Sequence, residues 1–182
     1  MAKALGMVEY ATVSLGIAAA DTMLKTAEVE VIEAQTVCPG KYIAIIAGDL
    51  SAVKAAVDAS KTRFGEKLID TFVLGNPHES VIPSIYGTGN VENPKALGIL
   101  ETFSVASMIR AADAAAKTAA VQLIELRLAK GMCGKSYMLI TGEVAAVTAS
   151  IERAKAEAGG ASMFLDSQVI ANPDMKLWQS IL

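Results

Sequence analysis

The feature that most constrains this chain is an internal repeat that covers almost its whole length. Residues 3–9 (KALGMVE) return as residues 95–101 (KALGILE), and further echoes follow in the first helix, a hairpin turn and an Asn-Pro pair near the end of each half. The offset between copies is 92 at the start, 94 after the second strand and 96 near the end. Two short insertions explain that drift, so the chain is a tandem duplication whose halves are expected to act side by side in a ring.

The repeat divides the 182 residues into two domains of about 85–90 residues each. We place the first domain at residues 3–86 and the second at 95–182, joined by a glycine-rich, polar linker at 87–94. The period is well above the roughly 20–50 residues of solenoid repeats, which favours two globular domains over a superhelical array. Because so short a linker spans at most about 30 Å, the two copies are expected to be neighbours.

Hydrophobic periodicity predicts a small α+β domain in each copy. The expected elements of the first copy are strands at 4–10, 29–37, 42–47 and 68–74, and helices at 15–27 and 50–64. Asn76-Pro77 is expected to open a short final helix, with the asparagine as its cap and the proline in its first turn. This order is that of a ferredoxin-like (split βαβ) sandwich, a four-stranded antiparallel sheet with helices on one face.

Composition narrows the partners that the chain can have. Hydrophobic residues make up 53% and charged residues 19%, which is apolar for a soluble protein and favours large contacts with other chains. No apolar run reaches the roughly 18–20 residues of a membrane span. The net charge is −3 with signs interspersed, which argues against nucleic acid as a partner. Two cysteines and no recognisable secretion signal favour a reducing cytosol without a structural disulfide.

Four motifs, each present in both copies, carry a resemblance to a known family. They are Ala-Leu-Gly-x-x-Glu in the first strand, Asp-x-x-x-Lys-x-Ala in the first helix, Gly-Lys in the hairpin, and Asn-Pro before the last helix. The chain resembles the tandem-domain, trimeric shell proteins of bacterial microcompartments. The resemblance implies a homotrimer that forms a flat pseudo-hexamer with a central pore. It also implies edge-to-edge packing with other shell proteins, in a microcompartment shell within the cytoplasm.

The first hairpin carries Cys38-Pro39-Gly40-Lys41, which resembles the shell proteins of propanediol-utilisation compartments that hold an iron–sulfur cluster at the pore. The resemblance implies that Cys38 of three subunits binds one 4Fe-4S cluster on the threefold axis, for electron transfer across the shell with an encapsulated redox enzyme. Such clusters usually need about four ligands, which one cysteine supplies only through symmetry. The competing interpretation of a lone cysteine is a small buried or loop thiol without a function.

The remaining pore-loop candidates are Pro39, Gly40 and Lys41 in the first copy and Cys133, Gly134 and Lys135 in the second. Alignment of the two Gly-Lys pairs places Cys133 opposite Pro39, one position from Cys38. Cys133 is therefore either a fourth ligand or a spectator. The two lysines either face a permeant or begin a strand as solvated side chains.

Asp21 with Lys25, and Asp113 with Lys117, have the spacing of helical ion pairs. By resemblance these residues lie at the tile edge; alternatively they are weak surface pairs. His78, whose counterpart is Asp174, is expected to be a surface residue at the start of the short helix, with a pH-sensing or edge role as the alternative. Trp178 is expected to pack in the last helix.

Three functions fit the sequence to different degrees. The first is a shell protein, not an enzyme, whose pore holds the cluster. The second is the same tile without metal, acting as a diffusive pore for a small polar metabolite. The third is an enzyme or small-molecule sensor on a duplicated ferredoxin-like scaffold, which would need paired acid and base residues that the sequence does not offer. The encapsulated pathway and the permeant cannot be predicted from the sequence.

Overall fold

The computed structural model describes residues 3–87, 91, 93–160 and 162–182. The first repeat runs β1 (Ala4–Tyr10), α1 (Val13–Thr26), β2 (Val29–Val37), β3 (Lys41–Gly48), α2 (Leu50–Phe64), a 3₁₀ turn η1 (Gly65–Lys67), β4 (Leu68–Gly75) and α3 (Val81–Ile85). The second runs β5 (Ala96–Thr102), α4 (Val105–Thr118), β6 (Val121–Leu128), β7 (Ser136–Gly142), α5 (Val144–Gly160), β8 (Phe164–Ile170) and α6 (Met175–Ile181). The predicted strands and long helices agree to within about two residues, the usual uncertainty of such boundaries.

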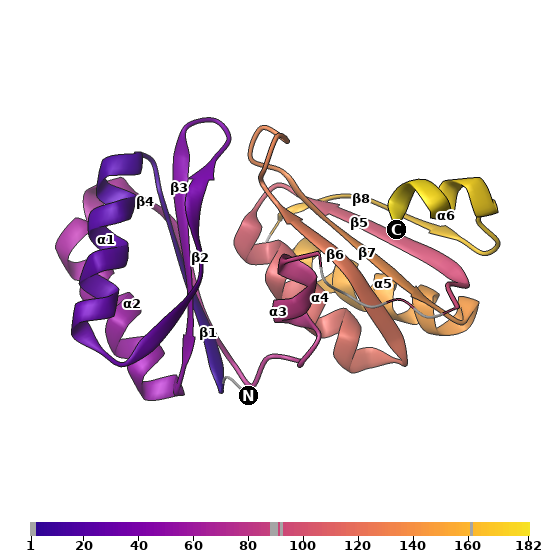
Figure 1. Cartoon of the computed structure of the whole chain (residues 1–182), viewed down its shortest axis with the longest axis horizontal. Coiled ribbons are helices and arrows are strands. Elements are labelled where there is room, and N and C mark those ends of the chain that lie inside the picture. The colour runs from indigo at the N-terminus through magenta and orange to yellow at the C-terminus, as the bar shows by residue number, and fades with distance from the viewer. Residues whose placement is uncertain (1–2, 88–90, 92, 161) are drawn as a thin grey trace. The chain divides into compact units, whose positions relative to one another are not determined.

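Each repeat forms one antiparallel sheet, with strand order β2-β3-β1-β4 in the first and β6-β7-β5-β8 in the second. The third strand of each repeat lies between the first and the second, which is the split βαβ plan. Helices α1 and α2 pack on each other and on the first sheet, and α4 and α5 do the same on the second (Figure 1). The predicted α+β class, with two four-stranded antiparallel sheets, is confirmed.

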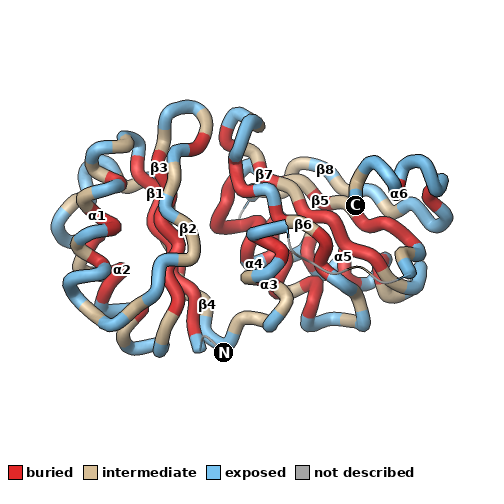
Figure 2. Tube along the Cα trace, viewed as in Figure 1, coloured by how far each residue is buried: buried red, intermediate tan, exposed pale blue. Residues whose placement is uncertain are grey.

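The glycine of the repeated Ala-Leu-Gly motif sets how closely a helix approaches its sheet. A Cβ atom added to Gly6 in β1 would lie 2.6 Å from Val53 Cγ1 of α2, and one added to Gly98 would lie 2.7 Å from Val147 Cγ1 of α5. Both valines are fully buried. Strands β1 and β5, which carry the two glycines, are coloured mostly red, as buried, in Figure 2. The motif therefore has a packing function, because any side chain at this position would push the helix away.

The chain divides into two compact units between Pro77 and His78. Helix α3 packs against β6 and α4, so the segment that the sequence analysis assigned to the end of the first domain lies with the second repeat. Residues 88–90 and 92 of the predicted linker lie outside the described residues. Helix α3 follows the last strand of the first repeat in the chain but belongs to the second compact unit.

The prediction that Asn76-Pro77 opens the short helix is wrong. Asn76 has a φ of 51°, whereas an N-cap residue needs an extended backbone, and α3 begins only at Val81 after Ser80. Asparagine is one of the few residues that tolerate the left-handed region, so it turns the chain out of β4 here. In the second repeat Asp174 caps α6, and its side chain accepts a hydrogen bond from the Lys176 N–H at 2.8 Å.

Candidate functional site

The first candidate loop is the turn between β2 and β3. The Gly40 N–H donates to the Val37 carbonyl at 3.0 Å, which closes a four-residue turn around Cys38 and Pro39. The Cys38–Pro39 peptide is cis, as in type VI turns. Gly40 has a φ of 82°, which favours glycine over any other residue. Cys38 is a free, half-buried thiol, and Pro39 and Gly40 are exposed.

The second candidate loop, between β6 and β7, spans residues 129–135, whereas the first spans residues 38–40. The Lys135 N–H donates to the Met132 carbonyl at 3.0 Å, with Cys133 at φ 52° and Gly134 at φ 88°. Two successive positive φ values define a type I′ turn. Cys133 is a free, exposed thiol. It therefore occupies the first central position of its turn, the position that Cys38 occupies in the other loop, although sequence alignment places it opposite Pro39.

The described part of one chain does not present a complete set of metal ligands, and its free thiols could take part only in a site shared with other chains. Among the described residues, no group of three or more His, Cys, Asp or Glu side chains is placed to hold a metal ion. Cysteine thiolates are the usual ligands of iron–sulfur clusters, and Cys38 offers one free, half-buried thiol in the turn of a hairpin. One chain thus offers a thiol of the kind that such a cluster uses, and a complete ligand set would need donors from other molecules.

Lys41 is held by an ion pair that the sequence analysis did not find. Its Nζ lies 2.8 Å from Oε1 of Glu9, whose side chain is only 5% exposed against 27% for Lys41. Glu9 lies in β1 and Lys41 begins β3, and the two strands are hydrogen-bonded neighbours. The lysine therefore neutralises a buried carboxylate at the base of the first loop. No ion pair is found for Lys135 within the described part of the chain.

A second polar cluster lies on β6 and β7 below the longer loop. Arg127 donates from Nε and Nη2 to Glu125 Oε1, at 2.9 and 2.7 Å, and the Tyr137 hydroxyl donates to Glu125 Oε2 at 2.9 Å. Burial, followed by the hydrogen bond to Glu125, raises the pKa of Tyr137. Sequence reasoning missed this cluster, although Glu-x-Arg on a strand places both side chains on one face.

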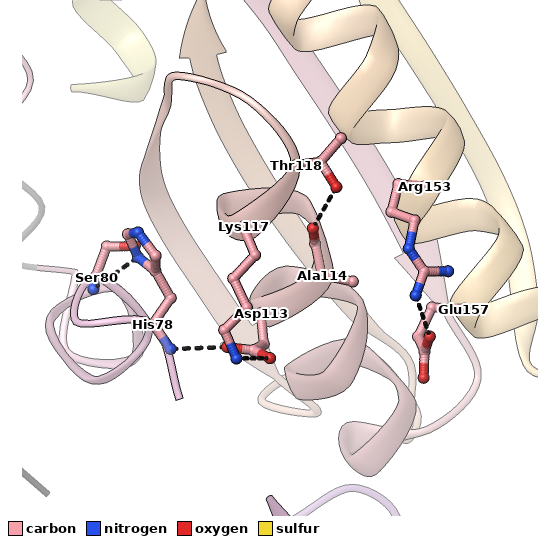
Figure 3. A network of polar contacts seen from close by, with 8 residues as sticks. All are labelled: His78, Ser80, Asp113, Ala114, Lys117, Thr118, Arg153 and Glu157. Atoms are coloured by element: carbon pink, nitrogen blue, oxygen red, sulfur yellow. Dashed lines mark hydrogen bonds and ion pairs between the residues drawn. The ribbon is translucent and has the colours of Figure 1, made fainter. Parts of the chain in front are cut away.

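The two predicted edge pairs form, in different surroundings. Lys25 Nζ lies 2.7 Å from Asp21 Oδ2, with both side chains exposed. Lys117 Nζ lies 2.7 Å from Asp113 Oδ2, but the Asp113 side chain is only 9% exposed. Its other oxygen accepts the His78 backbone N–H at 2.7 Å, as Figure 3 shows. The pair in the second repeat thus anchors the segment that leads into α3.

The two remaining aromatic candidates have structural contacts. His78 is half-buried, directly follows the Asn76-Pro77 pair and lies three residues before the first residue of α3. Its Nδ1 lies 2.8 Å from the Ser80 hydroxyl. The expectation of a surface residue inside a helix is therefore wrong, because α3 starts later. Trp178 is 3% exposed and packs with Leu97 and Leu139, in agreement with its predicted packing role.

Comparison with known proteins identifies the family. Residues 4–77 and 96–173 each match the BMC domain. The whole chain is 37% identical to the bacterial microcompartment shell protein PduT of Citrobacter freundii and covers 99% of it. A crystal structure of a microcompartment protein from Desulfitobacterium hafniense DCB has a TM-score of 0.92 at 44% identity, over 97% of this chain and 98% of that one. The chain belongs to the BMC-domain family of bacterial microcompartment shell proteins, in its tandem form.

More distant relatives share the architecture. The carboxysome assembly protein CcmO of Synechococcus elongatus is 30% identical over 164 residues, which are 83% of this chain and 58% of that protein. The fused permuted hexameric shell protein of the RMM microcompartment has a TM-score of 0.66 at 22% identity, over 87% of this chain and 84% of that one, and shows the fold alone. The predicted family and its place in the microcompartment shell are confirmed. None of the described helices is long and apolar enough to cross a membrane.

Proposed function

We propose that three copies of this chain form a structural shell tile with a central pore, and that Cys38 of the three copies binds one 4Fe-4S cluster there. The tile is non-catalytic and packs edge to edge with other shell proteins. Three chains with two BMC domains each supply six, so the tile is a pseudo-hexamer. Full-length similarity to the shell protein PduT and the tandem BMC domains support the tile.

The observation that carries the cluster assignment is the place of Cys38. It is a free thiol in the first central position of a hairpin turn, and no group of three or more potential metal ligands is found among the described residues. A threefold axis at this turn would bring three equivalent sulfurs together, which suits a cubane cluster with one further outside ligand. When bound, such a cluster supplies one-electron transfer, which in a shell would connect an encapsulated redox enzyme with the outside.

The experiment is anaerobic purification of the full chain, with iron and sulfide measured against protein. We expect one cluster per three chains and absorbance near about 400 nm. Cys38→Ser should abolish both signals. Cys133→Ser is the matched control, since it removes a thiol from the same turn position of the other loop, and it should keep the cluster.

Two results would contradict the assignment. One is a wild-type chain that stays free of iron after anaerobic reconstitution with iron and sulfide; the metal-free tile, a diffusive metabolite pore lined by Gly40 and Gly134, then describes the protein. The other is loss of the cluster in Cys133→Ser with retention in Cys38→Ser. A monomer in sedimentation analysis would refute the tile itself and favour the enzyme or sensor alternative.

A further inference from the structure

One face of the first repeat is apolar and exposed where its counterpart in the second repeat is covered. This α1–β2 face consists of Ile17, Asp21 and Leu24 of α1 and Val31 of β2, and the three α1 residues share one side of the helix. Ile17, Leu24 and Val31 are 53%, 45% and 41% exposed. The repeat offset pairs the four residues with Ile109, Asp113, Ala116 and Leu123, all of which are less than 9% exposed.

The segment that packs on the counterpart face is α3, which follows the last strand of the other repeat. It lies against α4 and β6 and buries Val81 and Ile85. The His78 N–H, just before α3, donates to the Asp113 carboxylate at 2.7 Å (Figure 3). One repeat thus covers the helix face of the next with the short helix that ends it.

The counterpart of α3 in the second repeat is α6. The two Asn-Pro pairs fix the offset at 96, which pairs His78 with Asp174. The same offset pairs the buried residues Val81 and Ile85 with Leu177 and Ile181. Leu177 is 38% exposed, so the side chains that α3 buries are not buried equally well in α6.

In the single chain α6 folds back on its own sheet and packs loosely there. Trp178 is buried against that sheet, but Leu177 and Ile181 line an apolar pocket of about 480 Å³ that is open to solvent. The backbones of the two repeats differ at the asparagine that precedes α3 in one and α6 in the other. Asn76 has a φ of 51°, whereas its counterpart Asn172 does not adopt a positive φ.

We infer that α6 of one copy docks on the α1–β2 face of the next copy, as α3 docks within the chain. Leu177 and Ile181 then cover the exposed apolar residues of that face, and the Asp174 N–H donates to the Asp21 carboxylate. Asn172 turns to the left-handed conformation, which asparagine tolerates. The inference rests on the proposed trimer and completes it, since three such head-to-tail contacts close a ring.

Cross-linking tests the contact directly. In a Cys38→Ser, Cys133→Ser background, the pair Asp21→Cys with Asp174→Cys should give covalent trimers with a short bismaleimide. The matched pair His78→Cys with Asp113→Cys reports the equivalent contact inside one chain and should give cross-linked monomers only. A trimer by sedimentation whose 21–174 pair links only within monomers would overturn the inference and leave the trimer standing.

A second pair of variants keeps Asp21 intact. Leu177→Asp places a charge at the position where α3 buries Val81, and it should weaken trimer association at least about tenfold. Met175→Asp is its control, because the counterpart of Met175 is Glu79, which is already acidic and exposed. Equal trimer affinity in the two variants would refute the docking of α6. A wild-type chain that is monomeric at every concentration would instead refute the proposed tile.

Discussion

The ion pair between Lys41 and Glu9 gives the sharpest prediction about the first loop. Lys41→Met keeps the length of the side chain and removes the charge, which leaves the buried Glu9 carboxylate without its partner. An exposed ion pair contributes about 1 kcal/mol or less, and removing one partner of a fully buried pair costs about 3–5 kcal/mol. Glu9 is 5% exposed and Lys41 27%, so we expect a loss of about 2–4 kcal/mol, nearer the buried limit.

The repeat supplies the control. Lys135→Met makes the same change at the equivalent position of the second loop, where no ion pair is found among the described residues, and should change stability by less than about 0.5 kcal/mol. The double variant Glu9→Gln with Lys41→Met removes both charges. It should recover part of the loss, because no uncompensated charge remains buried.

The assay is urea unfolding followed by circular dichroism, at one fixed protomer concentration because association shifts apparent stability. The reasoning is wrong if Lys41→Met and Lys135→Met are equally stable. Additive losses from Glu9→Gln and Lys41→Met would also refute it, since residues in one ion pair must couple. If Lys41 only faced a permeant, Lys41→Met would change transport through the pore and leave the midpoint of urea unfolding unchanged.

Three further predictions concern stability. Gly6→Ala should destabilise by about 1–3 kcal/mol through its clash with α2, whereas Gly65→Ala, which meets no atom within 4 Å, should be neutral or stabilising in thermal unfolding. Tyr10→Phe removes the hydrogen bond between the Tyr10 hydroxyl and Ser60 and should lower the free energy of unfolding by about 1 kcal/mol. Burial raises the pKa of Tyr10 above 10.0, so above about pH 10 the tyrosine ionises in the unfolded chain only, and the stability of the wild type should fall. The fall should be smaller in the variant. Asp113→Ala should expose α3 to hydrogen exchange, since it removes the acceptor of the segment's anchoring N–H.

The sequence predicted the elements well because its signals there are local. The apolar periodicity of β1 and α1 can be recognised from a few consecutive residues. The repeat, read twice, predicts the sheet order of both halves. The prediction for Asn76 was wrong because its conformation depends on contacts that are not local. An asparagine before a proline suits an N-cap and a left-handed turn equally well, and the choice between them depends on where α3 packs in the folded chain.

The candidate loops were found from the sequence, but their detailed geometry was not. Glu9 and Lys41 are 32 residues apart, and only the register of β1 with β3 brings them together. Cys133 was aligned through the Gly-Lys pair, but the second turn closes at Lys135, one position later in that pair than the first turn, which closes at Gly40. Cys133 therefore takes the turn position of Cys38. Whether two residues occupy equivalent positions in their turns depends on the hydrogen bond that closes each turn, and a sequence alignment does not show that bond.

The passage of α3 onto the second repeat has a consequence for how assembly depends on protein concentration. In a ring of six separate domains, every junction forms between molecules and each costs translational and rotational entropy. Here α3 meets α4 and β6 within one chain, at the high effective concentration that a short connection provides. If three chains close the ring, half of its junctions already exist inside the single chains. The equilibrium amount of ring then depends on the third power of the chain concentration, and not on the sixth power of a domain concentration. In the proposed trimer, fusion would thus allow the ring to form at concentrations where six single domains would remain apart.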